Sequence, residues 1–483
     1  MRNLKADVLS KGEIGLIHEG SLEVLSEVGI KIAHAGARSI MERAGCTVDE
    51  SNGVVRIPRD VINGALKSAP ESWTFSSRDG KHDAKMVSDG SRTNFMNLGM
   101  GTKICHYVSE NKFDTRDSTI PDIRNIAKVL DACENVDLVT QPVSALDLMD
   151  KRCVRTLHEA EAMITNTSKP FLLDPDPRYV DSYFDIMKAC YSGDEEEALK
   201  KPFLMVGGCS SSPLQLDTPF CELAIKAGEY NMPFMSMTMA MAGTTSPVTL
   251  AGTMVIHNSE ALAGITLAQL VKPGLPVIYG SCTTGFDFMT DTAPFGSPEN
   301  ALISSASSQM SQFYGVPCIT SGAISDSKCP DFQSAQEATL NALLPALNGT
   351  SNVFGVGLIE LGMTFSLEQA VMVNDMIPLI RHALEGFEVS SETLSIDAIK
   401  EVGIGGEFIS RPETMAGMFG HTHPELFDRN MYEGWKNTGG KHTLELAHEK
   451  VQSILSEHVA TPIEPGNLKE IQNIIREADK KVL

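Results

Sequence analysis

The chain has 483 residues, with 40 Lys and Arg against 62 Asp and Glu, so its formal net charge is −22 at pH 7. A charge of this sign disfavours DNA, RNA or an anionic membrane face as partners. The hydrophobic fraction of 42% and the charged fraction of 21% are ordinary for a globular protein, and the length suits one large barrel with appendages or about three domains.

No segment of the chain has the pattern of a membrane span or a secretion signal. The apolar stretch 232–243 is shorter than the roughly 20 residues of a spanning helix and contains Ser and Thr. Residues 1–7 lack the apolar region of a signal peptide. The ten cysteines are scattered without a Cys-x-x-Cys pair, which favours reduced thiols. We therefore expect a cytoplasmic protein.

Residues 1–90 are predicted to form an N-terminal helical extension. Helical patterns cover 10–45 and 58–68, and Asn52-Gly53 marks a tight turn between short extended pieces. This part is expected to cover the region that follows.

Residues 91–387 alternate between short apolar runs and longer amphipathic segments. The runs are mostly β-branched or rich in Met and Phe, and they end in Gly, Ser, Thr or Asp. The predicted strands are 94–98, 136–143, 170–173, 203–209, 234–240, 277–283, 318–323 and 352–358. The predicted helices are 118–133, 149–165, 177–192, 215–229, 246–269, 297–314, 332–347 and 366–386.

Short connections between alternating strands and helices indicate a parallel sheet, and eight repeats favour closure. Ser297-Pro298-Glu299 supplies an N-cap, a first-position proline and a first-turn acid, and Ser366 begins the last helix in a similar way. No G-x-G-x-x-G follows a first strand, which disfavours a dinucleotide-binding sheet. The fold class is therefore α/β, a (β/α)8 TIM barrel over 91–387.

Residues 388–483 are predicted to form a C-terminal helical extension. The segments 442–457 and 464–483 are charged and amphipathic. We expect this region to pack on the barrel or to join subunits of a homo-oligomer.

The active site of such a barrel lies at the C-terminal ends of its strands. The segments there, including 207–212, 322–326 and 355–362, consist of small residues, hydroxyls, apolar residues and a few carboxylates, with little acid–base chemistry. Carboxylates and aromatic rings without proton donors suit a cation that has no N–H group. Each feature also has a structural alternative: methionines fill cores, and Asp287 and Asp326 can cap turns. Glu360 lies in an apolar run, so its carboxylate must find a partner or face the cavity.

A zinc-dependent thiol methyltransferase is one alternative. Cys209 and Cys282 end two of the predicted strands, but a catalytic zinc needs about three protein ligands. Cys318 begins its strand and should point to the other face, and His257 lies within a helix. We expect no metal, and inert buried thiols.

Several of these segments, taken together, resemble the trimethylamine:corrinoid methyltransferase family. They are 246–253 (SPVTLAGT), 257–260 (HNSE), 292–299 (TAPFGSPE), 325–328 (SDSK) and 360–366 (ELGMTFS), with further likeness near both ends of the chain. The resemblance implies a (β/α)8 barrel. Archetypal members carry pyrrolysine within the segment 322–328, at the position of Ile324 here. The chain thus resembles the non-pyrrolysine branch, whose characterised members demethylate quaternary amines such as betaines.

A quaternary ammonium already carries the positive charge that makes its methyl group reactive. Its leaving group is a neutral tertiary amine, so no general acid and no catalytic side chain is expected; the site must hold the cation in line and exclude water. By position and type, the candidates for the ammonium group are Glu360, Asp326, Phe286, Phe354 and Phe365. A betaine carboxylate needs donors or a cation, for which the candidates are His421, His423 and Arg411 in a loop that could cover the barrel, and Lys328 and Gln333 at the rim.

The resemblance also implies a corrinoid as the methyl acceptor. The chain has no Asp-x-His-x-x-Gly motif for the lower ligand, so the corrinoid is expected on a separate partner protein. Glycine betaine is the favoured substrate, with proline betaine, carnitine and γ-butyrobetaine as alternatives. A non-catalytic betaine-binding protein, or a scaffold for the corrinoid protein, is the alternative from another class.

Overall fold

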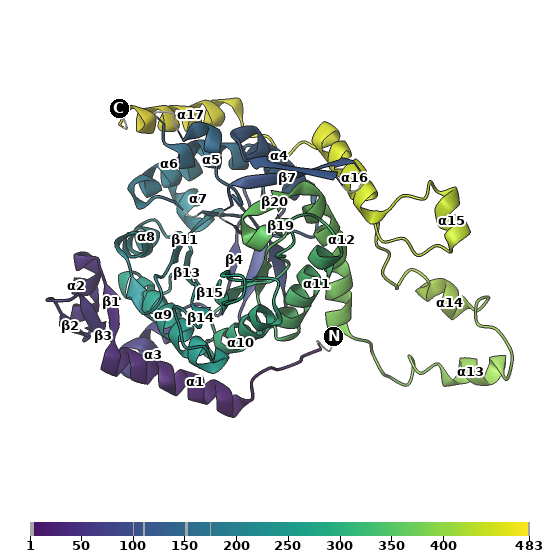
Figure 1. The fold of residues 1–483 in the computed structure, drawn as a ribbon, viewed down its shortest axis with the longest axis horizontal. Helices are drawn as coiled ribbons and strands as arrows, with labels where there is room; N and C mark the ends of the chain where they lie inside the picture. The colour runs from purple at the N-terminus through teal and green to yellow at the C-terminus, as the bar shows by residue number, and fades with distance from the viewer. Residues whose placement is uncertain (1–3, 100, 110–111, 150–152, 174, 482–483) are drawn as a thin grey trace.

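A closed ring of parallel strands forms the centre of the protein in this computed structural model, which describes residues 4–99, 101–109, 112–149, 153–173 and 175–481 (Figure 1). Neighbours pair in the order β6-β18-β17-β15-β13-β11-β10-β9, and a parallel bridge from Met96 to Leu138 closes β9 onto β6. The strands are β6 (Asn94–Met96), β9 (Val139–Thr140), β10 (Phe171–Leu173), β11 (Leu204–Cys209), β13 (Phe234–Thr238), β15 (Val277–Ser281), β17 (Cys318–Ser321) and β18 (Asn352–Phe354). The predicted barrel is confirmed, and each strand lies within a predicted run.

Helices surround this ring, as the amphipathic pattern predicts. They are α4 (Ile120–Ala132), α5 (Arg155–Ile164), α6 (Val180–Cys190), α7 (Glu195–Lys200), α8 (Thr218–Glu229), α9 (Leu250–Val271), α10 (Pro298–Tyr314), α11 (Phe332–Leu347) and α12 (Leu367–Glu385). The predicted caps are present: the Ser297 side chain accepts a hydrogen bond from Asn300 N, and the Ser366 side chain accepts one from Gln369 N.

The barrel interior is filled by inward-facing side chains and closed at its N-terminal end. Methionines such as Met205 and Met235 pack there with Phe354, so they serve as core. The hairpin of β4 (Ser72–Phe75) and β5 (Ala84–Val87) adds Phe75 and Met86 to the same cluster. Because the hairpin fills this end, a ligand must enter from the C-terminal end of the strands, which we call the mouth.

The N-terminal region contains strands as well as helices. Its elements are α1 (Lys11–Glu23), a π-helical turn (Val24–Val28), β1 (Ile30–Ile32), α2 (Ala35–Arg43), β2 (Thr47–Asp49), β3 (Val54–Arg56) and α3 (Arg59–Ser68). β1 to β3 form a small sheet with β12 (Gln215–Leu216), and Gly53 turns the chain with a φ of +74°. Strands of three residues are too short to show a clear alternation, which is why the helical prediction for 10–45 is wrong over β1.

The C-terminal region divides into a projecting part and a packed part (Figure 1). α16 (Thr443–Glu457) and α17 (Pro465–Lys480) lie against the barrel helices through Val451, Ile454, Ile471 and Ile475. Between α12 and α16, the chain extends sideways from the barrel as α13 (Ile396–Val402), α14 (Pro412–Gly417) and α15 (Tyr432–Asn437). Residues 386–442 are called the arm below.

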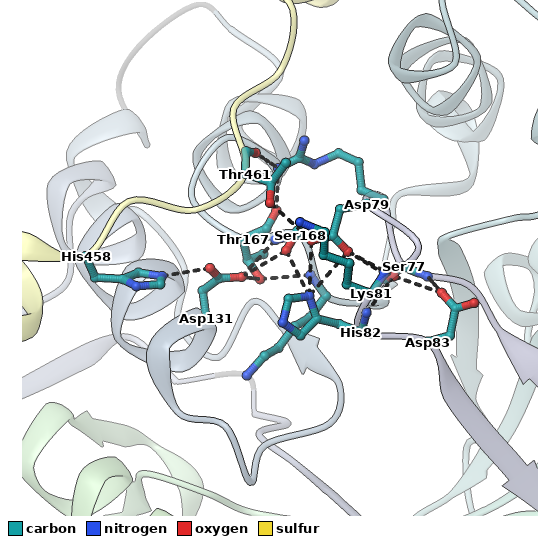
Figure 2. A network of polar contacts seen from close by, with 12 residues as sticks. Ser77, Asp79, Lys81, His82, Asp83, Asp131, Thr167, Ser168, His458 and Thr461 are labelled. Carbon is teal, nitrogen blue, oxygen red and sulfur yellow. Dashed lines mark hydrogen bonds and ion pairs between the residues drawn. The ribbon is translucent and has the colours of Figure 1, made fainter.

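A polar network holds the C-terminal segment against the closed end of the barrel (Figure 2). The Asp131 carboxylate accepts hydrogen bonds from Ser168 N at 2.9 Å and is paired with His458 Nε2 at 2.8 Å. Asp79, in the loop between β4 and β5, accepts a hydrogen bond from the Thr461 hydroxyl at 3.1 Å. The network therefore joins the closing hairpin to residues from the far end of the chain.

Within the described residues, no helix is both long enough and apolar enough to cross a lipid bilayer.

Candidate functional site at the barrel mouth

Two small sheets that the sequence analysis did not predict surround the mouth. One has the order β19-β20-β7-β8, and the other pairs β14 (Met241–Ala242) with β16 (Thr284–Gly285). The first joins β19 (Leu358–Ile359) and β20 (Thr364–Ser366) to β7 (Lys103–Ser109) and β8 (Lys112–Asp117). Its strands bring residues near 103 beside residues near 360.

Ile324 occupies the position at which the resemblance places pyrrolysine in archetypal family members. It lies in the loop after β17. Its side chain is only 2% exposed and belongs to the hydrophobic core. Gly355 approaches it so closely that an added Cβ would lie 2.8 Å from Ile324 Cβ. The loop is fixed to the neighbouring one by hydrogen bonds from Ser325 N to Leu358 O and from Glu360 N to Ser327 O. The position therefore presents packed hydrocarbon and no functional group.

Glu360 lies next to this loop in an unusual backbone turn. Glu360, Leu361 and Gly362 all have positive φ, at 51°, 59° and 83°. Two successive side-chain-bearing residues in this region are strained, and such strain concentrates at functional sites. The Glu360 carboxylate accepts a hydrogen bond from the Thr364 hydroxyl, and its Oε1 lies 3.6 Å from Lys103 Nζ. The two charged side chains are 30% and 43% exposed, so this pair is open at the mouth.

Asp326 fastens two mouth loops together. Its carboxylate oxygens each accept a backbone hydrogen bond at 2.9 Å, from Phe295 N and Gly296 N. Burial raises its pKa to about 6, with nearby Glu337 adding to the effect and the two backbone N–H groups opposing it. Asp326 thus fills the capping role that the sequence left open. Asp287 is likewise a turn residue, accepting a hydrogen bond from Met289 N.

Glu337 on α11 was not predicted as a site residue, and it organises the same loop. Its Oε2 accepts hydrogen bonds from the Ser325 hydroxyl at 2.7 Å and from Asp326 N at 2.8 Å. Gln333, a predicted rim residue, donates to Glu337 Oε1 at 2.8 Å and is exposed. Lys103 was not predicted as a site residue either. Nothing in the local sequence links Glu337 or Lys103 to the mouth.

The predicted aromatic side chains lie in different environments. Phe286 is half-buried at the rim, with its ring centroid 5.2 Å from that of Phe288. Phe354 is 3% exposed inside the barrel, and Phe365 is fully buried against Gly357. Phe286 is thus the most accessible of the three predicted rings.

The residues predicted to cover the barrel lie on the arm. His421 and His423 are exposed between α14 and α15, beside the barrel in Figure 1. Arg411 is paired with Glu401 and Glu413 of the arm itself. The structure does not bring these three residues to their own mouth, because the chain turns sideways after α12. Lys328 remains at the rim, where its Nζ donates to Asp326 O.

Behind the mouth, α9 carries the 257–260 motif as a fully buried row of polar side chains. Glu260 accepts hydrogen bonds from Ser210 Oγ, Ser212 Oγ and Leu214 N, which follow β11. His257 lies within hydrogen-bond distance of the Thr283 hydroxyl, and burial lowers its pKa to about 3, so it is neutral. These residues shape the strand ends from behind.

The cysteines of the zinc alternative do not form a ligand set. Cys209 is exposed and Cys282 half-buried at the mouth, whereas Cys318 is buried on the outer face of its strand, as predicted. No three His, Cys, Asp or Glu side chains in the part of the chain that the structure describes form a group suited to a metal ion.

Comparison with known proteins identifies the family. A family model described as trimethylamine methyltransferase (MTTB) matches residues 2–482. The chain belongs to the trimethylamine methyltransferase family. As a member, it is a methyltransferase.

Relatives within the family differ in their named substrates. The trimethylamine methyltransferase of Methanosarcina barkeri strain Fusaro is 42% identical over 99% of this chain and 97% of the relative. That of Desulfitobacterium hafniense strain DCB-2 is 36% identical, covering 97% and 93%. The glycine betaine methyltransferase of D. hafniense strain Y51 is 29% identical, covering 99% and 98%.

Among solved structures, the monomethylamine methyltransferase of Methanosarcina barkeri has a TM-score of 0.51 at 11% identity, covering 99% of this chain and 88% of its own. This likeness supports the barrel fold of the present chain.

Proposed function

We propose that the protein transfers a methyl group from a quaternary amine to the Co(I) corrinoid of a partner protein. The observation that carries this proposal is Ile324, buried at the position where archetypal members of the family have pyrrolysine. A hydrocarbon side chain offers no electrophile to a neutral amine. A quaternary ammonium needs none, because its positive charge is permanent.

The reaction needs positioning more than proton transfer. The N–CH3 bond breaks with its electron pair remaining on nitrogen, so the leaving group is a neutral tertiary amine. The acceptor supplies the pair for the new bond to the methyl carbon. Catalysis can therefore come from holding the donor in line in a site without competing water.

Glu360 and Lys103 offer complementary charges for a zwitterion. Their charged atoms are 3.6 Å apart and accessible at the mouth, close to the separation of the charges in a short betaine. We place the ammonium beside Glu360, with Phe286 at the rim, and the carboxylate beside Lys103. Glycine betaine fits this spacing best; proline betaine, carnitine and γ-butyrobetaine require more of the rim, where Lys328 and Gln333 lie.

The acceptor is proposed to approach over the mouth on its own protein. Exposed apolar side chains surround it, including Val248, Phe288, Met289 and Met363. A broad apolar rim of this kind suits a partner that docks and leaves. We place the reaction in the cytoplasm, since none of the ten cysteines forms a disulfide in the described structure.

Trimethylamine is the second candidate substrate, because the chain is more similar to trimethylamine methyltransferases than to the glycine betaine methyltransferase. A direct assay distinguishes it from the proposed quaternary amines. The purified protein is mixed with a reduced corrinoid protein and with each amine in turn, and the cobalt absorbance is followed. We expect methylation with glycine betaine or a related betaine at a rate at least about tenfold above that with trimethylamine, a difference of about 1.4 kcal/mol in barrier. Equal or faster methylation from trimethylamine would overturn the proposal, and binding without methylation would indicate a silent betaine-binding protein.

A further inference from the structure

Hydrogen bonds link three loops at the mouth to one another. They are the loop before α10 (286–297), the loop after β17 (322–331) and the turn that joins β19 to β20 (360–363). The turn carries Glu360, the carboxylate that we assign to the substrate ammonium. The orientation of this carboxylate therefore depends on the contacts that hold the turn.

The turn is strained, and the loop after β17 holds it. Glu360 and Leu361 have φ values of 51° and 59°, which residues with side chains adopt only where the surrounding contacts impose them. Glu360 N donates to Ser327 O at 2.7 Å, and Leu361 N donates to Ser325 O at 3.3 Å. The Ile324 side chain packs on the last part of the turn, with its Cδ1 3.3 Å from an ideal Cβ placed on the glycine at 362. Both the hydrogen bonds and the packing thus come from residues 324–327.

A single carboxylate on α11 fixes those residues. Glu337 Oε2 accepts hydrogen bonds from the Ser325 hydroxyl at 2.7 Å and from Asp326 N at 2.8 Å. Ser325 Oγ in turn accepts a hydrogen bond from Ser327 N at 2.9 Å. Ser325 is fully buried, and a buried hydroxyl that loses its acceptor is costly, so Glu337 favours one conformation of the loop.

The Glu337 side chain itself has a rigid support. α11 is packed into the core through Ala338 and Ala342. One turn after Glu337, Asn341 donates to Gly296 O at 3.0 Å. The Gly296 backbone lies against the carboxyl group of Glu337, so closely that an added Cβ would be 2.4 Å from Glu337 Cδ. The carboxylate is therefore confined between its own helix and the loop before α10.

We propose that Glu337 is a positioning residue for Glu360 and acts through residues 324–327. This inference rests on the proposed function, in which Glu360 faces the ammonium group of the substrate. The attraction between a carboxylate and a cation falls as their separation grows, so a turn that relaxes away from its strained conformation binds the cation less tightly. Glu337 thus contributes to substrate affinity through the turn and not through contact with the substrate.

The first test compares two substitutions of Glu337 by calorimetric titration with glycine betaine. Glu337→Ala should raise the Kd at least about fivefold, since alanine keeps the helix but offers no acceptor. Glu337→Gln should stay within about twofold of wild type, because both loop bonds go to one oxygen and an amide oxygen can accept both. The matched control is Gln336→Ala, an exposed neighbour on α11, which should bind as wild type does. Equal losses for Ala and Gln would show that the charge of Glu337 acts directly, and would refute a positioning role.

A double-mutant cycle separates positioning from a general weakening of the fold. If Glu337 acts through Glu360, then Glu337→Ala introduced into the Glu360→Gln variant should change the Kd by less than about twofold, because the positioned charge is already absent. A purely structural effect would weaken binding by the same factor in both backgrounds. That additive result would overturn the inference while leaving the proposed substrate intact.

Amide hydrogen exchange examines the turn without any substrate. In Glu337→Ala the N–H groups of Glu360 and Leu361 should exchange at least about tenfold faster than in wild type, whereas Glu337→Gln should leave them protected. The reference is Ser168 N, bonded to Asp131 at the closed end of the barrel, whose exchange should not change. Unchanged exchange at the turn would contradict the inference. If glycine betaine does not bind the wild type, the proposed substrate is wrong, and the exchange rates alone decide whether Glu337 holds the turn.

Discussion

At the scale of single residues, three acidic side chains of the mouth have different roles. Glu360 is half-buried and lies opposite a lysine, Asp326 caps two backbone N–H groups, and Glu337 holds the loop that contains Asp326. From residue type alone, each of the three carboxylates could equally bind a cation. Only their hydrogen-bond partners separate a ligand-facing carboxylate from two structural ones.

Glu360→Gln should weaken the binding of a quaternary amine. The amide keeps the size and the acceptor oxygen but removes the charge beside the ammonium, so we expect a loss on the order of 1–3 kcal/mol, or about 5- to 150-fold in Kd. Calorimetric titration with glycine betaine measures it. The control is Glu388→Gln, an exposed acid on the arm, and an affinity unchanged by Glu360→Gln would remove this carboxylate from the site.

Asp326→Asn should flatten the pH dependence of stability between about pH 4 and pH 6. The folded-state pKa of about 6 exceeds the ordinary value of 3.8, so the folded state binds the proton more tightly. The contribution of Asp326 to stability is therefore present below pH 3.8 and is lost as the pH rises through 6. Thermal melts of wild type and variant across this range measure the difference. Asp397→Asn, fully on the surface, is the control, and a variant that keeps the wild-type slope would contradict the assignment.

At the scale of elements, the mouth is built by backbone segments that are fixed from behind. α9 is buried along much of its length, and its Glu260 binds the loop that follows β11 through three hydrogen bonds. Burial raises the pKa of Glu260, and the hydrogen bonds oppose that rise. The motif at 257–260 thus stabilises the shape of the site without facing the mouth.

Glu260→Ala should destabilise the fold by about 3 kcal/mol, since it leaves two hydroxyls and one N–H without their acceptor and opens a cavity. Glu260→Gln retains an acceptor for Leu214 N, and its amide can donate to the serine hydroxyls, so its cost should be about 1 kcal/mol. Urea unfolding of both variants measures the two free energies of unfolding. Equal costs for Ala and Gln would show that the three hydrogen bonds contribute little.

At the scale of the whole molecule, the β4–β5 hairpin and the segment between α16 and α17 meet at the closed end of the barrel. The hairpin loop near residue 79 and the segment near residue 460 share one polar network (Figure 2). Burial opposes ionisation of Asp79, but hydrogen bonds from Lys81 N, Ser168 and His82 outweigh it and hold the pKa of Asp79 well below its ordinary value. The closing hairpin is therefore stabilised by an ionised carboxylate.

Asp79→Asn should lower stability at neutral pH, with a loss that shrinks in acid. Because the folded-state pKa is depressed, the contribution of Asp79 is present above the unfolded value of 3.8 and is lost as the pH falls towards the lower folded value. Chemical denaturation at pH 7 and at pH 3 compares the variant with wild type. A difference that is the same at both pH values would contradict this role.

The sequence by itself determined the order of strands and helices, the barrel and the hydrocarbon at position 324. Local periodicity carries the first two, since an inward strand and an amphipathic helix each repeat within a few residues. The strands before residue 60 and the strands β14, β16, β19 and β20 at the mouth escaped this reasoning because two or three residues show no period. The longer strands β7 and β8 escaped it because neither shows a clear alternation of apolar and polar residues.

Only the tertiary structure decided which charged groups meet. Lys103 faces Glu360 because two strands from distant parts of the chain pair in one sheet, and Asp326 is a cap because Phe295 and Gly296 present their N–H groups to it. The same holds for the segment between α14 and α15, which contains His421 and His423 and lies beside the barrel in Figure 1. Hydrogen bonds and ion pairs act over a few ångströms in space, and local sequence patterns do not encode contacts between residues far apart in the chain.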